Sequence, residues 1–377
     1  MIDVIIPVYK GVHETRRCIH SVLESVQRES FEVVVVNDAS PDPEIVTWLE
    51  GLAAIGSVTL LRNDANNGFV QSVNRGMSLH PDRDVVLLNS DTEVANDWLD
   101  RLADIASSAP DIGTATPFSN NATICTYPFP GWTGGLPGGL GLAALDRLFA
   151  RVNAHRTVDL PTAVGFCMYI RRTCLQQVGL FDAERFGRGY GEENDFCLRA
   201  ARTGWRNVLA ADVFVFHEGA VSFSGEWNER AGAALQAVLD VHPDYLQLVR
   251  QFNLRDPSRG AREAVDLARC GAGPEEAACV LAEQSAQHAQ LAERLAPLEK
   301  LADERAALAA ELGRGLRHAE TLLTEYMEEI GKLRAGLAHA EALVLERDAT
   351  IRKQGAELDR IHGSWLLKPI ILLMRRS

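Results

Sequence analysis

The sequence predicts an α/β protein in which a doubly wound, largely parallel sheet is followed by a long α-helical coiled coil. Short apolar runs alternate with helical patterns through the first 255 residues, and this βαβα rhythm is typical of parallel sheets covered by helices. Beyond residue 285 the chain is rich in Ala, Leu, Glu and Arg, with apolar residues at heptad spacing. The 377 residues are enough for two or three domains of roughly 150 residues each.

Composition excludes several classes of protein. Apolar residues make up 46% and charged residues 24% of the chain, which predicts a folded globular protein rather than a disordered one. The net charge of −13 leaves no broad basic field for nucleic acid. The seven cysteines are scattered and never form CxxC, so we expect a reducing compartment and neither disulfides nor a zinc ribbon. No basic leader or membrane-length apolar run is present, and we expect a cytoplasmic location.

The predicted strands are nearly all apolar, as expected for strands that are buried on both faces. The helices between them carry one apolar stripe each. Strands are expected at 3–8, 31–36, 58–61 and 84–88, helices at 15–26, 45–52 and 70–77, and a further core segment and helix at 163–170 and 193–203. Residues 119–160 differ because two Gly-Gly pairs interrupt 131–141. A loop of this length is typical of lids and binding loops.

The C-terminal third has its own organisation. Residues 256–285 are polar with Gly, Pro and Ser at intervals, which predicts a linker with a short helix. From Leu316 to Ile361, an apolar seam with spacings of three and four is broken only by Arg347 and Gln354. Such a period predicts a left-handed coiled coil, which we place at 286–362. Pro297 is expected to kink or start it. The alternative is an amphipathic helix folded onto the globular unit.

Residues 363–377 form a basic amphipathic tail. It contains Trp365, a Leu and Ile cluster and three cations, with no acidic residue. This composition is typical of shallow contact with a membrane surface. A packed helix terminus is the alternative.

Polar side chains follow each of the first four predicted strands. In parallel α/β sheets, ligands bind at the carboxyl ends of the strands. A single Asp or Asn there is usually a helix cap or a turn residue, but four strands that end this way favour a binding site. The residues are Tyr9 and Lys10; Asn37 and Asp38; Asn63, Asp64, Asn66 and Asn67; and Asn89, Ser90 and Asp91.

The class of ligand can be restricted by two motifs that are missing and by one pattern that is present. No GxGxxG follows the first strand, which disfavours a dinucleotide, and no GxxxxGK[ST] exists, which excludes a P-loop. Asn89 and Asp91 leave the same side of an extended chain. Mg²⁺ or Mn²⁺ commonly binds one or two carboxylates and then a phosphate. We therefore expect a nucleotide that carries a diphosphate.

Five segments together carry a family resemblance. In chain order they are Ile5-Ile6-Pro7-Val8-Tyr9, Val36-Asn37-Asp38-Ala39-Ser40, Asn67-Gly68-Phe69 with Asn74-Arg75-Gly76, Leu87-Leu88-Asn89-Ser90-Asp91-Thr92, and Gly189-Tyr190-Gly191-Glu192-Glu193-Asn194-Asp195-Phe196-Cys197-Leu198-Arg199. In this order and spacing they resemble the motifs of family 2 glycosyltransferases, which are inverting enzymes of the GT-A fold and use nucleotide sugars. The resemblance covers roughly residues 1–255. It implies a GT-A, Rossmann-like mixed sheet with a nucleotide-binding half at 1–118 and an acceptor half at 119–255.

The resemblance also implies roles for the nucleotide-binding residues. Pro7, Tyr9 and Asp38 would line the nucleoside pocket, with Asp38 accepting a hydrogen bond from the base or ribose. Asn67 would lie nearby.

For the metal, Asn89-Ser90-Asp91 occupies the position of the family's DxD motif. Its first Asp is Asn here, so Asn89 and Ser90 are expected at the nucleotide and Asp91 as the retained metal ligand. His217 matches a late histidine that often completes the coordination, although without the family it would be read as a core or loop histidine.

The expected chemistry is direct displacement at the anomeric carbon by an acceptor hydroxyl. A divalent ion stabilises the charge on the leaving diphosphate, and a carboxylate takes the acceptor proton. Glu192, Glu193 and Asp195 lie at a helix start, which favours ionised acids, while their crowding raises at least one pKa. On a helix, Glu192 and Asp195 share a face and Glu193 points elsewhere.

These arguments leave the base open among the three acids. The family's acidic pair implies Glu193 as the base, with Asp195 as the second choice. The alternative is that all three acids only cap the helix.

The expected function is therefore transfer of a UDP- or dTDP-sugar to a glycan or lipid-linked glycan. The tail resembles those that follow coiled coils in bacterial polysaccharide glycosyltransferases, which implies work on O-antigen or capsule. The coiled coil would join a second copy or a partner enzyme, and the tail would contact the inner face of the membrane. Two alternatives stay open: a non-catalytic nucleotide-sugar sensor on a coiled-coil scaffold, and a sugar nucleotidyltransferase. The latter needs a Gly-rich, Arg-containing loop after the first strand, which 8–13 does not supply.

Overall fold

The computed structural model describes all residues except 133, 188, 220–226, 313–316 and 364–377. The chain divides into two compact units, Met1–Ala268 and Arg269–Ser377. We describe each unit by itself.

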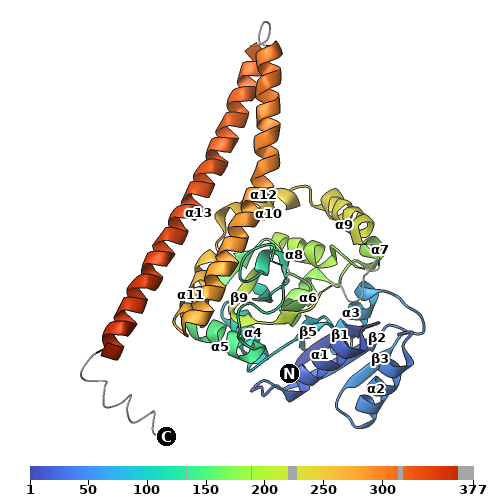
Figure 1. The fold of residues 1–377 in the computed structure, drawn as a ribbon. Coiled ribbons are helices and arrows are strands. Elements are labelled where there is room, and N and C mark those ends of the chain that lie inside the picture. The colour runs from blue at the N-terminus through green and yellow to red at the C-terminus, as the bar shows by residue number, and fades with distance from the viewer. Residues whose placement is uncertain (133, 188, 220–226, 313–316, 364–377) are drawn as a thin grey trace. The chain divides into compact units, whose positions relative to one another are not determined.

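The first unit is built on one mixed sheet of eight strands in the order β3-β2-β1-β4-β8-β6-β9-β7 (Figure 1). The first four strands pair in parallel, β8 runs antiparallel to β4 and β6, and β7 runs antiparallel to β9. The strands are β1 (Ile2–Val8), β2 (Phe31–Asn37), β3 (Thr59–Arg62), β4 (Asp84–Leu88), β6 (Ile112–Phe118), β7 (Thr157–Leu160), β8 (Cys167–Ile170) and β9 (Arg206–Phe214). The predicted α/β mixed sheet is therefore confirmed, and its antiparallel pairs lie in the second half.

Helices cover both faces of this sheet (Figure 1). They are α1 (Val12–Glu24), α2 (Pro43–Ala54), α3 (Phe69–Met77), α4 (Trp98–Ser107), α5 (Leu142–Val152), α6 (Arg172–Val178), α7 (Ala183–Phe186), α8 (Glu192–Arg202), α9 (Trp227–Val241), α10 (Tyr245–Arg255) and α11 (Arg259–Cys270). A 3₁₀ turn, η1 (Thr123–Cys125), follows β6, and a separate two-stranded ribbon pairs β5 (Thr92–Glu93) with β10 (Phe216–His217).

The alternation of side chains along the buried strands produces two cores. In β2, Val33 and Val35 belong to one apolar cluster and Val34 and Val36 to the other, because successive strand residues face opposite sides. In the second cluster α3 lies very close to β1: a Cβ added at Gly76 would lie 2.5 Å from Cγ2 of Ile5. Only glycine permits this approach, and it fixes α3 and the loop before it against the sheet.

Residues 119–160 and 256–285 contain more structure than the sequence predicts. The first segment holds η1, α5 and β7, so only its part up to Gly141 is an irregular loop. The second is occupied mostly by α11 and the start of the next helix. Ala261 and Val265 of α11 are fully buried in the first core, so the first unit extends beyond the boundary at residue 255 that the sequence predicts.

The second unit consists of two long helices, α12 (Pro274–Leu312) and α13 (Arg317–Gly363). Pro297 lies inside α12 and does not end it. Helix α13 covers nearly the whole predicted heptad seam, but a coiled-coil partner stays a prediction. The tail lies outside the described residues from position 364 onward. None of the described helices combines the length and the apolar character that crossing a bilayer requires.

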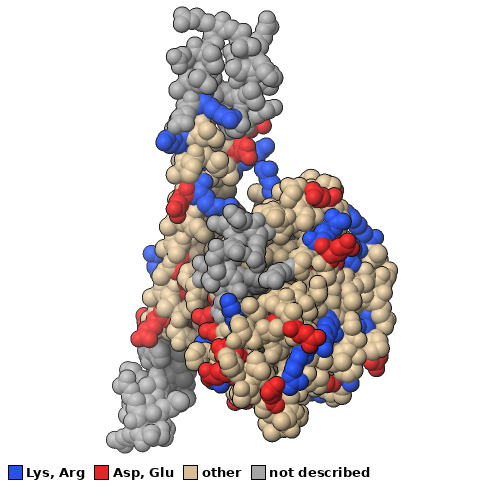
Figure 2. Space-filling model, turned by 90° about the vertical axis from the view of Figure 1, so that its right-hand side faces the viewer, with Lys and Arg blue, Asp and Glu red and all other residues tan. Residues whose placement is uncertain are grey.

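Acidic and basic side chains are interspersed on the surface. Figure 2 shows one face, on which Lys and Arg alternate with Asp and Glu and leave wide uncharged areas between them. Several of these charges are ion pairs, such as Arg206 with Asp159 at 2.6 Å. Exposed pairs of this kind contribute little to stability.

Candidate active site

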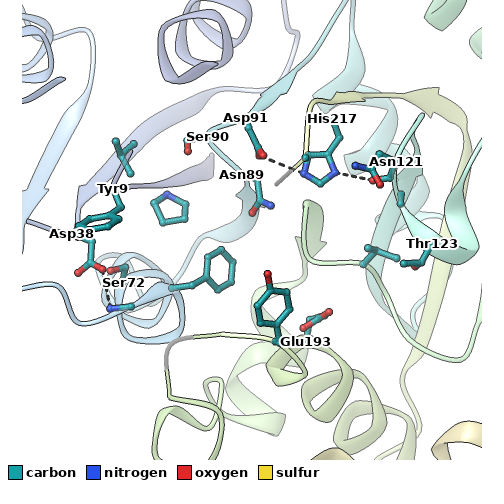
Figure 3. Close-up of a pocket in the computed structure, with 18 of the residues that line it drawn as sticks. Tyr9, Asp38, Ser72, Asn89, Ser90, Asp91, Asn121, Thr123, Glu193 and His217 are labelled. Carbon is teal, nitrogen blue, oxygen red and sulfur yellow. Dashed lines mark hydrogen bonds and ion pairs between the residues drawn. The ribbon is translucent and has the colours of Figure 1, made fainter. Parts of the chain in front are cut away.

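A cavity of about 480 Å³ lies at the carboxyl ends of β1, β2 and β4 (Figure 3). Helix α8 contributes its far wall. Eight of the predicted site residues line it: Pro7, Tyr9, Asp38, Asn89, Ser90, Asp91, Glu193 and His217. The other lining residues include Asn66, which the sequence places among the polar residues after the third strand, and Phe69, Ser72, Asn121, Thr123, Val164 and Tyr190, to which the sequence pattern assigned no role of their own. The structure therefore brings together residues from both halves of the unit.

Asp38 organises the loop that closes one end of the cavity. Its Oδ1 accepts hydrogen bonds from Asn63 Nδ2 at 2.7 Å and from the Asn67 amide at 2.8 Å, and its Oδ2 accepts from the Gly68 amide at 2.8 Å. Asn67 takes part through its main chain alone, because its side chain is exposed. The neighbouring Asn66 lines the cavity instead. The loop geometry thus depends on Asp38.

At the opposite end, Asp91 and His217 lie together because β5 and β10 pair. The register sets His217 opposite Thr92, which brings His217 Nε2 to 3.4 Å from Asp91 Oδ1 (Figure 3). His217 Nδ1 is 2.7 Å from the carbonyl oxygen of Asn121. The Nδ1–H donates to that carbonyl, which directs Nε2 toward Asp91.

This pair fits a divalent cation. Two adjacent ligands of an octahedral Mg²⁺ or Mn²⁺ ion lie about 3 Å apart when each bond is about 2.1 Å, close to the 3.4 Å observed. The imidazole also stacks on Phe166, with ring centroids 5.2 Å apart. Burial acts to lower the pKa of His217, but Asp91 and the Asn121 carbonyl raise it above its ordinary value overall. A carboxylate oxygen and an imidazole nitrogen are therefore preset as ligands.

Asn120 holds the main chain of His217 in place. Its Oδ1 accepts from the His217 amide at 2.9 Å, and its Nδ2 donates to the carbonyl oxygens of His217 and Gly134, each at 3.0 Å. The Asn120 side chain is buried, and it makes the hydrogen bonds to the His217 main chain that a neighbouring strand would otherwise make. The sequence held a signal for this residue, since Ser119-Asn120-Asn121 follows β6 as polar residues follow the other strands.

We expect Asn120→Asp to weaken Mn²⁺ binding by at least about tenfold, because changes to groups that orient metal ligands typically cost 10- to 100-fold. The substitution removes two donors and sets a carboxylate against two carbonyl oxygens. Titration calorimetry with Mn²⁺ measures the effect. Asn153→Asp is the matched control: Asn153 is equally buried and donates to the Ala261 carbonyl at 3.1 Å, whereas the hydrogen bonds of Asn120 go to His217. Equal Mn²⁺ affinities in the two variants would contradict a positioning role.

The three acids at the start of α8 have separate environments. Glu193 lines the cavity and faces Asp91 and His217 across it (Figure 3). Glu192 is buried, and its Oε2 has no hydrogen-bond partner among the described residues. Asp195 is buried too, with Arg199 Nε 2.7 Å from Oδ2 and His242 Nε2 2.8 Å from Oδ1. Asp195 thus ties α8 to the turn after α9, and neither it nor Glu192 lines the cavity.

Burial raises the pKa of both glutamates. The pKa of Glu192 is well above its ordinary value, from burial first and then from the charge of Glu193. Burial also raises the pKa of Glu193, and nearby backbone amides oppose the shift. Two adjacent carboxyl groups in this setting share their titration. The protons of this pair therefore leave in steps that belong to both carboxyl groups, and Glu193 is the member that lines the cavity.

We expect the rate of the reaction to rise with pH through a limb that lies above 4.5, the ordinary value for glutamate. A raised pKa keeps Glu193 protonated, and unable to accept a proton, up to a higher pH. A profile of turnover against pH at saturating Mn²⁺ measures the limb, and donor affinity at each pH separates it from loss of metal at His217. A limb that persists unchanged in Glu193→Gln would assign it to another group.

Backbone strain concentrates around this cavity. In the part of the chain that the structure describes, six residues other than glycine have a left-handed backbone. Three of them belong to the site: Ala39 directly follows Asp38, and Thr123 and Tyr190 line the cavity with φ of 46° and 76°. A left-handed β-branched or bulky residue is unusual. Such strain persists where the surroundings over-determine the backbone, as they do at functional sites.

Together, the mixed sheet and the cavity across its carboxyl edge give the first unit a GT-A-like fold. Residues 3–179 match the family model described as Glycosyl transferase family 2.

Curated relatives and a solved structure agree with this assignment. The chain is 22% identical to "Glycosyltransferase AglE" of Haloferax volcanii over 217 residues, 57% of this chain and 66% of the relative. It is 29% identical over 187 residues to "N-acetylglucosaminyl-diphospho-decaprenol L-rhamnosyltransferase" of Mycobacterium tuberculosis, 44% of this chain and 60% of the relative. The structure of GalNAc-T7 with UDP, GalNAc and Mn²⁺ matches with a TM-score of 0.50 at 18% identity, over 71% of this chain and 55% of that one. This last match shows a shared fold.

Proposed function

We propose that this protein is an inverting glycosyltransferase that moves a sugar from a nucleoside diphosphate sugar to a hydroxyl group of a glycan. One observation carries the proposal: Asp38, the Asp91–His217 pair and Glu193 line the same cavity. The names of the two relatives support it. Both are named as glycosyltransferases, and the name of the M. tuberculosis relative includes a sugar that a diphosphate links to a lipid. The GalNAc-T7 structure contains UDP and Mn²⁺, which supports a nucleotide and a divalent cation here as well.

Each end of the cavity has its own task. The end built by Pro7, Tyr9, Asp38 and Phe69 holds the nucleoside. Asp91 and His217 hold the cation, and when bound this ion supplies Lewis-acid stabilisation of the charge on the leaving diphosphate. Glu193 accepts the proton of the attacking hydroxyl at its carboxylate. Because Glu193 lies across the cavity from the metal ligands, the hydroxyl attacks from the face opposite the leaving group, and the product is inverted.

The acceptor and the setting complete the proposal. A lipid-linked glycan of a bacterial surface polysaccharide, such as O-antigen or capsule, is the acceptor, and the M. tuberculosis relative supports this class by its name. The protein works in the cytoplasm, on the inner face of the membrane, where the basic tail contacts the surface.

A donor screen tests the function. Calorimetric titration with UDP-, dTDP- and GDP-sugars, each with Mn²⁺ or Mg²⁺, should find one donor class whose binding needs the cation. Slow release of the sugar to water should accompany that binding. Binding with neither hydrolysis nor transfer to any hydroxyl acceptor would favour the nucleotide-sugar sensor instead.

We further propose that the heptad seam of α13 pairs with a second copy of the chain. Ile330, Leu333, Leu337, Val344 and Ile351 on this seam are only half-buried in the single chain. Leu337→Glu should therefore turn the dimer into a monomer in analytical ultracentrifugation. Ala335→Glu, which adds the same charge at an exposed position off the seam, should stay dimeric. A wild-type chain that sediments as a monomer at all concentrations would overturn this proposal.

A further inference from the structure

We propose that Tyr190 is the acceptor platform: the less polar face of an acceptor sugar ring lies on its phenol ring, with one hydroxyl directed to Glu193. The inference rests on the proposed function and adds to it the residue that selects a pyranose acceptor. Gly189, Tyr190 and Gly191 are three successive residues with positive φ, at 130°, 76° and 89°. Glycine adopts such a conformation freely, whereas tyrosine is strained in it.

The two glycines fix this segment on both sides. A Cβ added at Gly189 would lie 3.4 Å from Cβ of Phe69, so the main chain is in close contact with the nucleotide-binding half. A Cβ at Gly191 would lie 2.8 Å from Cγ2 of Val238 and 3.2 Å from the Phe186 ring. The backbone on both sides of Tyr190 is thus packed against other parts of the first unit, and the half-buried side chain of Tyr190 lines the cavity.

The position of Tyr190 in the cavity favours the acceptor over the donor. The donor end is formed by Pro7 near the end of β1, by Tyr9 and Asp38 directly after β1 and β2, and by Phe69. Tyr190 lies two residues before the start of α8 and three residues before Glu193, within the acceptor half. A hydroxyl that loses its proton to Glu193 must lie within hydrogen-bond distance of that carboxylate. The rest of the acceptor then lies beside the residues that flank Glu193 in the cavity.

The chemistry of a phenol suits a sugar ring. An aromatic side chain offers a large rigid face at low entropic cost, and binding pockets commonly use such faces with a few polar groups to set orientation. A flexible alkyl alcohol or an amino-acid hydroxyl would not use an extended flat face. Glycine would adopt the backbone conformation of residue 190 without strain. A tyrosine is expected there only if its side chain has a function that outweighs the strain.

The test compares Tyr190→Gly with Tyr190→Phe in the full chain, with the donor that the calorimetric screen selects and p-nitrophenyl glycosides as acceptors. We expect Tyr190→Gly to raise the acceptor KM at least tenfold. Its donor Kd and its rate of donor hydrolysis in water should stay within twofold of wild type, and its thermal midpoint should be equal or higher. Tyr190→Phe keeps the ring and should keep the acceptor KM.

His155→Gly is the matched control. His155 is exposed, has φ of 56° and does not line the cavity, so relief of strain there should leave every kinetic constant unchanged. An unchanged acceptor KM in Tyr190→Gly, with an active wild type, overturns the inference alone. A donor Kd that weakens as much as the acceptor KM assigns Tyr190 to the donor and also overturns it. A wild type that neither binds nor hydrolyses any nucleotide sugar overturns the proposed function together with this inference.

Discussion

Glu193→Gln is expected to lower the transfer rate by roughly 10²- to 10⁴-fold, the usual contribution of a general base, while donor affinity stays within about twofold. The amide keeps the shape of the side chain but cannot accept the acceptor's proton. Single-turnover transfer and donor calorimetry on the same preparation separate the two effects. The structure supports the assignment because Glu193 is the member of the acidic cluster that lines the cavity.

Glu192→Gln supplies the matched control for this prediction. Its carboxyl group is buried outside the cavity lining, and burial raises its pKa, so a neutral amide of similar shape should leave transfer within a few-fold of wild type. Asp195→Asn should act on stability instead, because removal of one partner from a buried ion pair costs about 3–5 kcal/mol. A variant Glu193→Gln that transfers sugar normally, beside a folded but inactive Asp195→Asn, would show that the base is misassigned.

Asp91→Asn is expected to abolish cation-dependent donor binding, with a loss of about 100-fold or more, comparable to the removal of metal by EDTA. Among the described residues that line the cavity there is no lysine or arginine, whereas Asp38, Asp91 and Glu193 are acidic. A diphosphate entering this cavity meets like charge, and a cation must compensate for it. Calorimetric titration of the donor, with Mn²⁺ present and absent, measures the dependence.

Asp159→Asn is the control for Asp91→Asn. It makes the same chemical change in an exposed acid of β7 that pairs with Arg206 and lies outside the cavity lining. Donor affinity should not respond to it. Donor binding of equal strength in Asp91→Asn, or in wild-type protein with EDTA, would show that the metal has no part in donor binding.

The main sheet was predictable because its signals are local and strong. Buried parallel strands such as β2 read as continuous apolar runs, and the edge where they end is known in advance, so Asp38 and Asp91 could be placed at one site. Helix geometry likewise anticipated the acids of α8. Glu192 and Asp195 share the buried face, and Glu193 is directed to the cavity.

The rest depends on contacts that the sequence does not display. The two-residue strands β5 and β10 are too short to have a period, yet they bring His217 to Asp91. Helix α11 looks like part of a polar linker in the sequence because its inward face carries charge. Arg262 and Asp266 are buried there, and Asp266 Oδ1 accepts from Tyr127 Oη at 2.7 Å. The role of Tyr190 could not be predicted, because the strain in its backbone is visible only in the three-dimensional structure.

The most direct test of the central claim is a crystal structure of the full chain with Mn²⁺ and the nucleotide that the donor screen selects, with the ion located by its anomalous scattering. We predict an anomalous peak bound by both Asp91 and His217, with the diphosphate on that ion and the nucleoside against Asp38. A nucleotide bound elsewhere, or a diphosphate in this cavity without contact to an ion at Asp91, would contradict the claim.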